Sequence, residues 1–399
     1  MLARSFATFL LASSVSLTAL SAAHAVEPQD VANRFKELVA GQGATLSWSS
    51  VEEMGGAIVM RGATVKGNAE IPPANLGDIT FEGVEEADNG DYVVETLSMP
   101  TYSTVSEGAT VTLDGLSISG AVLPSPTSTD IVSQSGFFDS LDVDTVKVEK
   151  DGKQLFTMSG LNYSLERADD GRSYEFTGTA DAFSADLSGT GDPQTLAMLT
   201  ALGLTQPKGT FEMAGSWTLD DGNMSLEQMD FTVDNAGTVG FTIDVSGYTE
   251  DFLKAAREMQ KNLANATEEQ KASAGMAAMG LMQQLSFGGA SIRYDDNTLA
   301  GRALDLAGGM QKMKRTDLAK MAEAMIPAAI GQYVKPEFAK QVAGEVAKFI
   351  QDPKSIEISA EPAQPVPFMS VGMSAMSAPQ NIPDELGITV TANEDAEEE

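Results

Sequence analysis

The feature that most constrains the fold is a stretch covering residues 45–247, in which apolar and polar residues alternate. The clearest run has Phe211, Met213, Gly215, Trp217 and Leu219 at every second position. Successive side chains of a strand point to opposite sides of a sheet. The alternation therefore predicts strands with one apolar face and one polar face.

Short turn sequences separate these runs. Asn89-Gly90 and Asp151-Gly152 each lie between two alternating segments, and Asp220-Asp221-Gly222 follows the run that contains Trp217. Asp-Gly and Asn-Gly supply the positive φ angles that tight hairpin turns require. We therefore expect consecutive strands to pair as antiparallel hairpins in one long, curved meander.

After Gly247 the period changes from two to that of helices. Helices are expected from Thr249, as an N-cap, and over 268–285, 299–308, 317–331 and 336–351, with Thr316 capping the fourth. A short strand around Ile292 and Tyr294 interrupts them, and strands return at 355–360 and 388–391. Pro362, Pro365 and Pro367 predict a stiff connector between these last two strands, and the acidic residues 393–399 predict a disordered tail.

The fold class predicted is α+β, with a long antiparallel meander followed by a helical segment and a returning C-terminal strand. Four regions follow from the changes in pattern. They are a signal peptide (1–25), a β-rich region (26–249), a mainly helical region (250–353) and a C-terminal region of strands, connector and tail (354–399). The β-rich region opens with a short amphipathic helix over Pro28–Ala40, for which Asp30 is the expected N-cap.

The N-terminus has the three parts of a secretory signal. Arg4 is charged, residues 6–20 are apolar, and Ala23-His24-Ala25 is a small-x-small cleavage site. Cleavage would leave a chain that begins at Val26, and the location expected is the bacterial periplasm. The chain has no cysteine, so no disulfide and no lipid-modified cysteine is expected. No later apolar run is long enough to predict a transmembrane segment.

The charge is strongly negative, with 57 acidic and 25 basic residues and a net charge of −32. Such an excess repels nucleic acid and anionic lipid headgroups, which argues against a nucleic-acid partner. The charge is unevenly distributed, because residues 250–353 hold 13 acidic and 13 basic residues. Within them, Lys312, Lys314 and Arg315 form a small basic cluster that is expected to be a solvated helix end.

The chain lacks the side chains on which most catalytic mechanisms depend. The single histidine, His24, lies in the predicted signal, so neither a Ser-His nor a Cys-His pair can form in the mature chain. Paired carboxylates remain and keep a carboxylate-dependent hydrolase open as an alternative. The chain has no Asp-Thr-Gly or Asp-Ser-Gly motif, and we expect a non-enzymatic protein.

Two metal-binding hypotheses each have a structural alternative. The acidic turns at 169–171, 220–222 and 295–297 offer oxygen ligands for calcium, but hairpins select the same residues without metal. Met369, Met373 and Met376 could bind Cu(I), although methionine in helices is usually a packing residue. The expectation is no metal and no cofactor.

The apolar sheet face is the candidate binding site. Its residues are Phe211, Met213, Trp217, Leu219, Phe231, Phe241 and Ile243. If the helices of 250–350 pack across this face, it is an ordinary core. If part of it stays uncovered, it is a groove for acyl chains or another apolar ligand.

The run DFTVDNAGTVGFTIDVSGYTEDFL (residues 230–253) resembles segments of bacterial envelope proteins of the YdgA and AsmA-like type. AIVMRGATVKG (57–67) and TVTLDGLSISG (110–120) are similar to the same segments, and FIQDPKSIEIS (349–359) is similar to uncharacterised secreted alphaproteobacterial proteins. The resemblance implies an elongated curved sheet whose apolar inner face handles lipids or assists outer-membrane assembly. AsmA-like proteins usually keep an N-terminal membrane anchor, whereas this signal has a cleavage site.

These observations predict a non-enzymatic, secreted protein that binds lipids or other apolar envelope components on the sheet face. One alternative is a structural or interaction protein of the cell envelope with no ligand. The other is the carboxylate-dependent hydrolase. The sequence does not identify protein partners.

Overall fold

The computed structural model describes residues 26–394, except 68–73, 107, 170, 190, 265–274 and 276–277. The predicted signal, half of the predicted helix over 268–285 and the end of the acidic tail therefore lie outside the described residues.

One sheet of 16 strands organises the molecule. The strands of its first half are β1 (Ala44–Ser47), β2 (Ser50–Met54), β3 (Ala57–Gly67), β4 (Ala74–Glu86), β5 (Tyr92–Ser106), β6 (Ala109–Leu123), β7 (Ser140–Lys150) and β8 (Lys153–Arg167). The strands of its second half are β9 (Ser173–Ala185), β10 (Lys208–Thr218), β11 (Met224–Val233), β12 (Gly237–Ser246), β13 (Ser286–Asp296), β14 (Ser355–Ala360), β15 (Val366–Pro367) and β16 (Ile388–Ala392).

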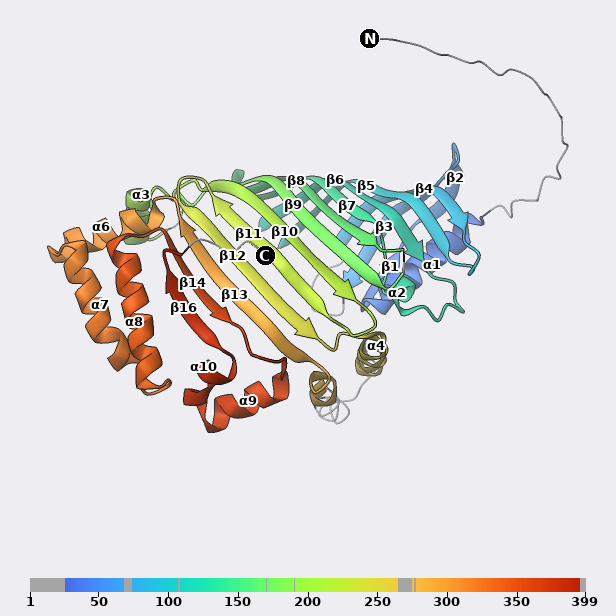
Figure 1. Ribbon diagram of the computed structural model, residues 1–399. Helices are drawn as coiled ribbons and strands as arrows, with labels where there is room; N and C mark the ends of the chain where they lie inside the picture. Colours follow the sequence, from blue (N-terminus) through green and yellow to red (C-terminus); the bar gives the residue numbers. More distant parts are fainter. Residues whose placement is uncertain are drawn as a thin grey trace, which may run out of the picture.

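The strand order follows the chain. From β3 to β14 each strand is the antiparallel neighbour of the next, β16 pairs with β14, and β1 and β2 both pair with β3. Figure 1 shows these strands as one continuous, bent sheet. The predicted antiparallel meander and the returning C-terminal strand are confirmed. The sheet also continues beyond residue 249, because β13 joins β12 to β14.

Helices lie at the two ends of the sheet and along its rims (Figure 1). They are α1 (Pro28–Gly41), α2 (Ile131–Gln134), α3 (Pro193–Leu202), α4 (Glu250–Ala264), α6 (Leu299–Gln311), α7 (Arg315–Ile330), α8 (Pro336–Gln351), α9 (Phe368–Ser377) and α10 (Ile382–Glu385). The bounds predicted for α8 are those observed. Thr249 lies before α4 as expected and accepts a hydrogen bond from the Phe252 N–H at 3.3 Å.

Two local predictions are wrong. Asp30 does not cap α1; the N-cap is Glu27, and Asp30 lies in the first turn, where its carboxylate accepts hydrogen bonds from Arg34 Nε at 3.0 Å and Tyr92 Oη at 2.9 Å. For α7 the N-cap is Lys314, two residues before the predicted cap, so Thr316 is inside the helix. The chain after Pro367 also forms α9, a helix that the Ser- and Gly-containing sequence does not predict.

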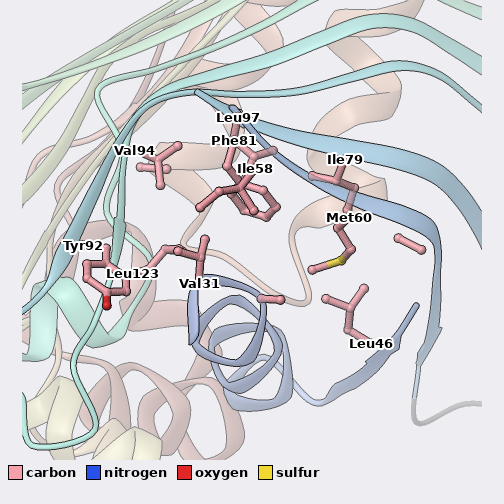
Figure 2. Close-up of a cluster of buried hydrophobic side chains, with 13 residues drawn as sticks. Val31, Leu46, Ile58, Met60, Ile79, Phe81, Tyr92, Val94, Leu97 and Leu123 are labelled. Carbon is pink, nitrogen blue, oxygen red and sulfur yellow. The ribbon is translucent and has the colours of Figure 1, made fainter. Parts of the chain in front are cut away.

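The largest closed core lies between α1 and the first strands (Figure 2). Val31 and Ala32 of α1 are fully buried there, together with Met60, Ile79 and Phe81 of β3 and β4. Phe35 of α1 meets the Phe81 ring edge-on, with ring centroids 5.4 Å apart. One amphipathic helix is therefore enough to cover this end of the apolar face.

Glycines with positive φ interrupt the strands of the first half. Gly115 in β6 has φ +68°, and a Cβ there would lie 2.1 Å from Oδ2 of Asp144 on β7. The same arrangement pairs Gly83 with Glu95, Gly120 with Asp139 and Gly160 with Asp181. Only glycine adopts this conformation without strain while a neighbouring side chain lies across it. The strand register continues across these glycines without a shift, so they change the local backbone without inserting an extra residue.

Candidate apolar binding face

The strand register puts the apolar residues of β10–β14 on one side of the sheet. Phe211 of β10 lies opposite Phe231 of β11, Phe241 of β12 opposite Ile292 of β13, and Ile292 opposite Ile358 of β14. Directly opposed residues of antiparallel strands project to the same face. An apolar face therefore crosses these strands without interruption.

The other side of the same strands is polar. Hydroxyl groups pair across it, with Thr232 and Thr238 2.9 Å apart, Thr242 and Ser291 2.9 Å apart, and Ser359 and Thr389 2.8 Å apart. Arg293 also bridges Asp295 and Glu357 on this side. This side needs no covering layer, because its groups are satisfied by one another and by water.

The apolar side is open over part of its area. Phe231 is 37% exposed, and Ile292 and Ile358 are each 51% exposed. Phe211 and Phe241 beside them are half-buried, and the rings of Phe211 and Phe231 are 4.8 Å apart. We call these five residues, Phe211, Phe231, Phe241, Ile292 and Ile358, the open patch. Large apolar side chains on central strands normally lie under a second layer, so their exposure makes this face a candidate interaction surface.

Beside the open patch, side chains of one strand lie across glycines of the next. Met213 lies over Gly178, and the Phe176 ring lies over Gly215, where a Cβ would come 2.4 Å from Phe176 Cζ. These glycines let bulky groups lie flat along the sheet.

One end of the face is closed by α2 and α4. Trp217 stacks on Tyr174 with centroids 5.3 Å apart and donates a hydrogen bond from Nε1 to the Tyr248 carbonyl at 3.0 Å. Leu219 lies just beyond β10, 4% exposed, and packs in the buried cluster of Ile131, Val132 and Tyr174. Leu253 of α4 packs against this cluster.

The seven residues predicted for the site are thus divided by the structure. Phe211, Phe231 and Phe241 belong to the open patch, Met213 and Ile243 are half-buried, and Trp217 and Leu219 lie at the closed end. Ile292 and Ile358 were not assigned to the face from sequence. Their alternation with Tyr294 and Ile356 was visible, but only the register shows that β13 and β14 extend the same face.

A half-buried carboxylate at the end of β13 has a structural role. Asp296 accepts hydrogen bonds from Tyr294 Oη at 2.7 Å and from the Ala300 N–H of α6 at 2.7 Å. Burial raises the pKa of Asp296, but these hydrogen bonds outweigh it and hold the pKa below its ordinary value. Burial and Asp296 together raise the pKa of Tyr294. The pair fixes the start of α6 to the end of β13.

Two of the three acidic turns that suggested calcium have protein donors at their carboxylates, and Asp170 of the third lies outside the described residues. Asp220 pairs with Arg172, and Asp221 accepts hydrogen bonds from Thr218 and from the Asn223 N–H. Asp295 pairs with Arg293. Within the described ranges, no three His, Cys, Asp or Glu residues are grouped so as to hold a metal ion. Of the three methionines considered for copper, Met373 and Met376 of α9 are exposed.

Comparison with known proteins gives one finding. A family described only as an uncharacterised protein matches residues 230–393. This segment begins in β11, ends just after β16 and contains four of the five residues of the open patch. No curated protein matches the chain. Among the described helices, none has the length and apolar character needed to cross a membrane.

Proposed function

We propose that this protein is a non-enzymatic carrier or chaperone of apolar envelope components, which it binds on the open patch. The single observation that supports the proposal is the exposure of Phe231, Ile292 and Ile358 on central strands of the sheet. A ligand that covered them would remove their apolar surface from water, which favours binding by about 25 cal/mol per Å².

The dimensions of the face suit an acyl chain. Five strands, β10–β14, cross it, and four strand spacings of about 4.8 Å extend for about 19 Å. One leaflet of a bilayer core is about 15 Å thick, which is the length that an ordered acyl chain occupies. None of the open-patch residues is charged, so recognition of a ligand would rest on shape and apolar contact.

A secreted, periplasmic location is part of this proposal, and so is the relationship to YdgA and AsmA-like proteins. N-terminal sequencing of the exported protein tests the first, with Val26 as the expected start. An uncleaved N-terminus would contradict a freely diffusing carrier.

The direct test is mass spectrometry of lipids extracted from the purified mature protein, together with displacement of a fluorescent fatty acid. A Phe231→Ser/Ile292→Thr/Ile358→Thr variant is expected to bind the probe about tenfold or more weakly, because three apolar contacts are lost. Met54→Gln/Val105→Thr/Met198→Gln is the matched control, since it changes three exposed apolar residues on β2, β5 and α3. No extracted lipid and equal probe binding by both variants would favour the ligand-free structural protein.

A further inference from the structure

Helix α9 carries three methionines on one side. Met369, Met373 and Met376 stand four and three residues apart, so on a helix of about 3.6 residues per turn they lie within about 60° of one another. Another side of the helix anchors it, because the Phe368 ring meets the ring of Phe287 on β13 with centroids 6.2 Å apart. The methionine side is therefore separate from the side that fixes α9 to the sheet.

Packing does not account for these methionines. Met373 is 58% exposed and Met376 is 90% exposed, while Met369 beside them is half-buried. Methionine is common in cores because its flexible side chain fills irregular gaps. A side chain that is nine-tenths exposed fills no gap in this chain. Three thioethers of one helix side are thus held together at the surface.

The surrounding sequence restricts what these side chains could bind. Neither histidine nor cysteine occurs after residue 24, so thioethers are the soft ligands of this region. Residues 362–383 contain no Asp, Glu, Lys or Arg, so α9 offers no carboxylate oxygens of the kind that Ca²⁺ and Mg²⁺ prefer. The neighbours on the methionine side are Gly372 and Ser377, whereas a helix that docks in an apolar groove presents a row of large apolar anchors.

We propose that Met369, Met373 and Met376 bind Cu(I) through their three sulfur atoms. Soft thioether ligands favour Cu(I) over harder ions. Helix neighbours three or four residues apart have Cβ atoms about 5–6 Å apart, and Met373 lies between the other two along the axis, so flexible side chains can bring all three sulfurs to one ion.

The local and overall electrostatics favour a cation at this position. Met376 is in the last turn of α9, where the helix dipole stabilises positive charge, and that turn contains no basic residue. The net charge of −32 attracts cations to the whole molecule. Three neutral sulfurs leave the single charge of Cu(I) uncompensated, and these two contributions offset it.

Titration of the full mature chain with Cu(I) tests the proposal, with ascorbate as reductant, without oxygen and in competition with the chromogenic chelator bicinchoninate. One Cu(I) per chain is expected to be withdrawn from the chelator, and X-ray absorption at the copper edge should show a coordination shell of sulfur only. Met369→Leu/Met373→Leu/Met376→Leu should abolish this binding, because leucine keeps the volume and apolar character of methionine but has no sulfur.

Two further variants separate the loss of ligands from other effects. Met373→Leu/Met376→Leu changes only exposed side chains, so it preserves the fold and should still lose the Cu(I) site. Met54→Leu/Met310→Leu/Met325→Leu is the matched control, since it changes three exposed methionines elsewhere and should leave binding as in the parent protein. Absence of Cu(I) binding overturns the proposal. So does equal loss in the control, retained binding in the α9 variants, or oxygen in the coordination shell.

This site does not rest on the proposed function, because none of its residues belongs to the open patch. Lipid extraction and probe binding without Cu(I) binding would overturn the copper site and leave the proposed function intact. Cu(I) binding without extracted lipid or probe binding would do the reverse.

Discussion

The two halves of the sheet have the same alternating pattern but differ in what covers them. At β3–β6 the apolar face lies under α1, and Phe81 is fully buried against Phe35. At β10–β14 the equivalent face leaves Phe231 exposed. Several strands of the first half also contain a glycine with positive φ, whereas no glycine inside β10, β11, β13 or β14 has one. The alternation determines that a sheet has an apolar face, and the added helices determine where that face is a core.

The largest effect is expected when a phenylalanine is replaced by alanine in each half of the sheet. Phe81→Ala should lower the free energy of unfolding by about 3–5 kcal/mol, because it leaves a cavity under α1. Phe231→Ala should cost less, about 1–2 kcal/mol, because its ring is already partly hydrated and leaves no closed cavity. Urea denaturation of both variants, monitored by circular dichroism, measures the difference. Similar costs for the two would mean that the second half is covered as well.

A second test addresses the glycines with positive φ inside the strands of the first half. Gly115→Ala places a Cβ against Asp144 and forces alanine into a left-handed conformation, which should cost about 2–3 kcal/mol of stability. Gly152→Ala, in the β7–β8 turn, has a similar φ of +72° but meets nothing within 4 Å, and should cost about 1 kcal/mol. The difference between the two in thermal or urea unfolding reports the contact with Asp144. If both cost the same, the carboxylate of Asp144 adds nothing to the requirement for glycine at position 115.

The smallest expected effect on stability is that of a substitution at Asp296, at the end of β13. The pKa of Asp296 is below its ordinary value of 3.8, so its contribution to stability is present above pH 3.8 and is lost as the pH falls through the lower, folded-state pKa. Asp296→Asn should therefore cost about 1 kcal/mol at neutral pH, as expected for a weakened helix start.

The same variant should show a shallower loss of stability below pH 3.8. Urea unfolding at a series of pH values measures this. Asp234→Asn, an exposed carboxyl of the adjacent turn, is the control. A steeper acid loss in the Asp296 variant than in the parent protein would contradict the assignment.

Much of the fold was readable from local signals. Alternation with Asp-Gly and Asn-Gly turns predicted the meander, and Pro336 with Asp352-Pro353 marked the bounds of α8. The prediction that Asp30 caps α1 was wrong because the Asp30 carboxylate accepts hydrogen bonds from Arg34 and from Tyr92, a residue 62 positions away. Helix α9 was missed because its Ser- and Gly-containing sequence has weak helix propensity, and Phe368 is held in place by the ring of Phe287.

The candidate site was only partly predictable for the same reason. Alternation identified which residues share a face, and it placed Phe211, Phe231 and Phe241 together. It could not separate Trp217, whose ring is covered by Tyr174 and Tyr248, from residues that stay exposed. Which helix lies over which strand depends on contacts distant in sequence, and the pattern of one strand does not contain them.

The sequential strand order has a consequence for how the chain folds. From β3 to β12 each strand pairs with the one made just before it, so these contacts join nearby parts of the chain and cost little chain entropy. The sheet can therefore grow from the N-terminus, one hairpin at a time, as the chain emerges. Growth by this route always leaves an edge strand whose backbone N–H and C=O groups are free to pair with another strand. At β16 that edge is occupied, because Oε2 of Glu345 accepts a hydrogen bond from the Ala392 N–H at 2.9 Å and α8 packs against the strand. The last strand thus ends assembly and protects the finished edge from pairing with another chain.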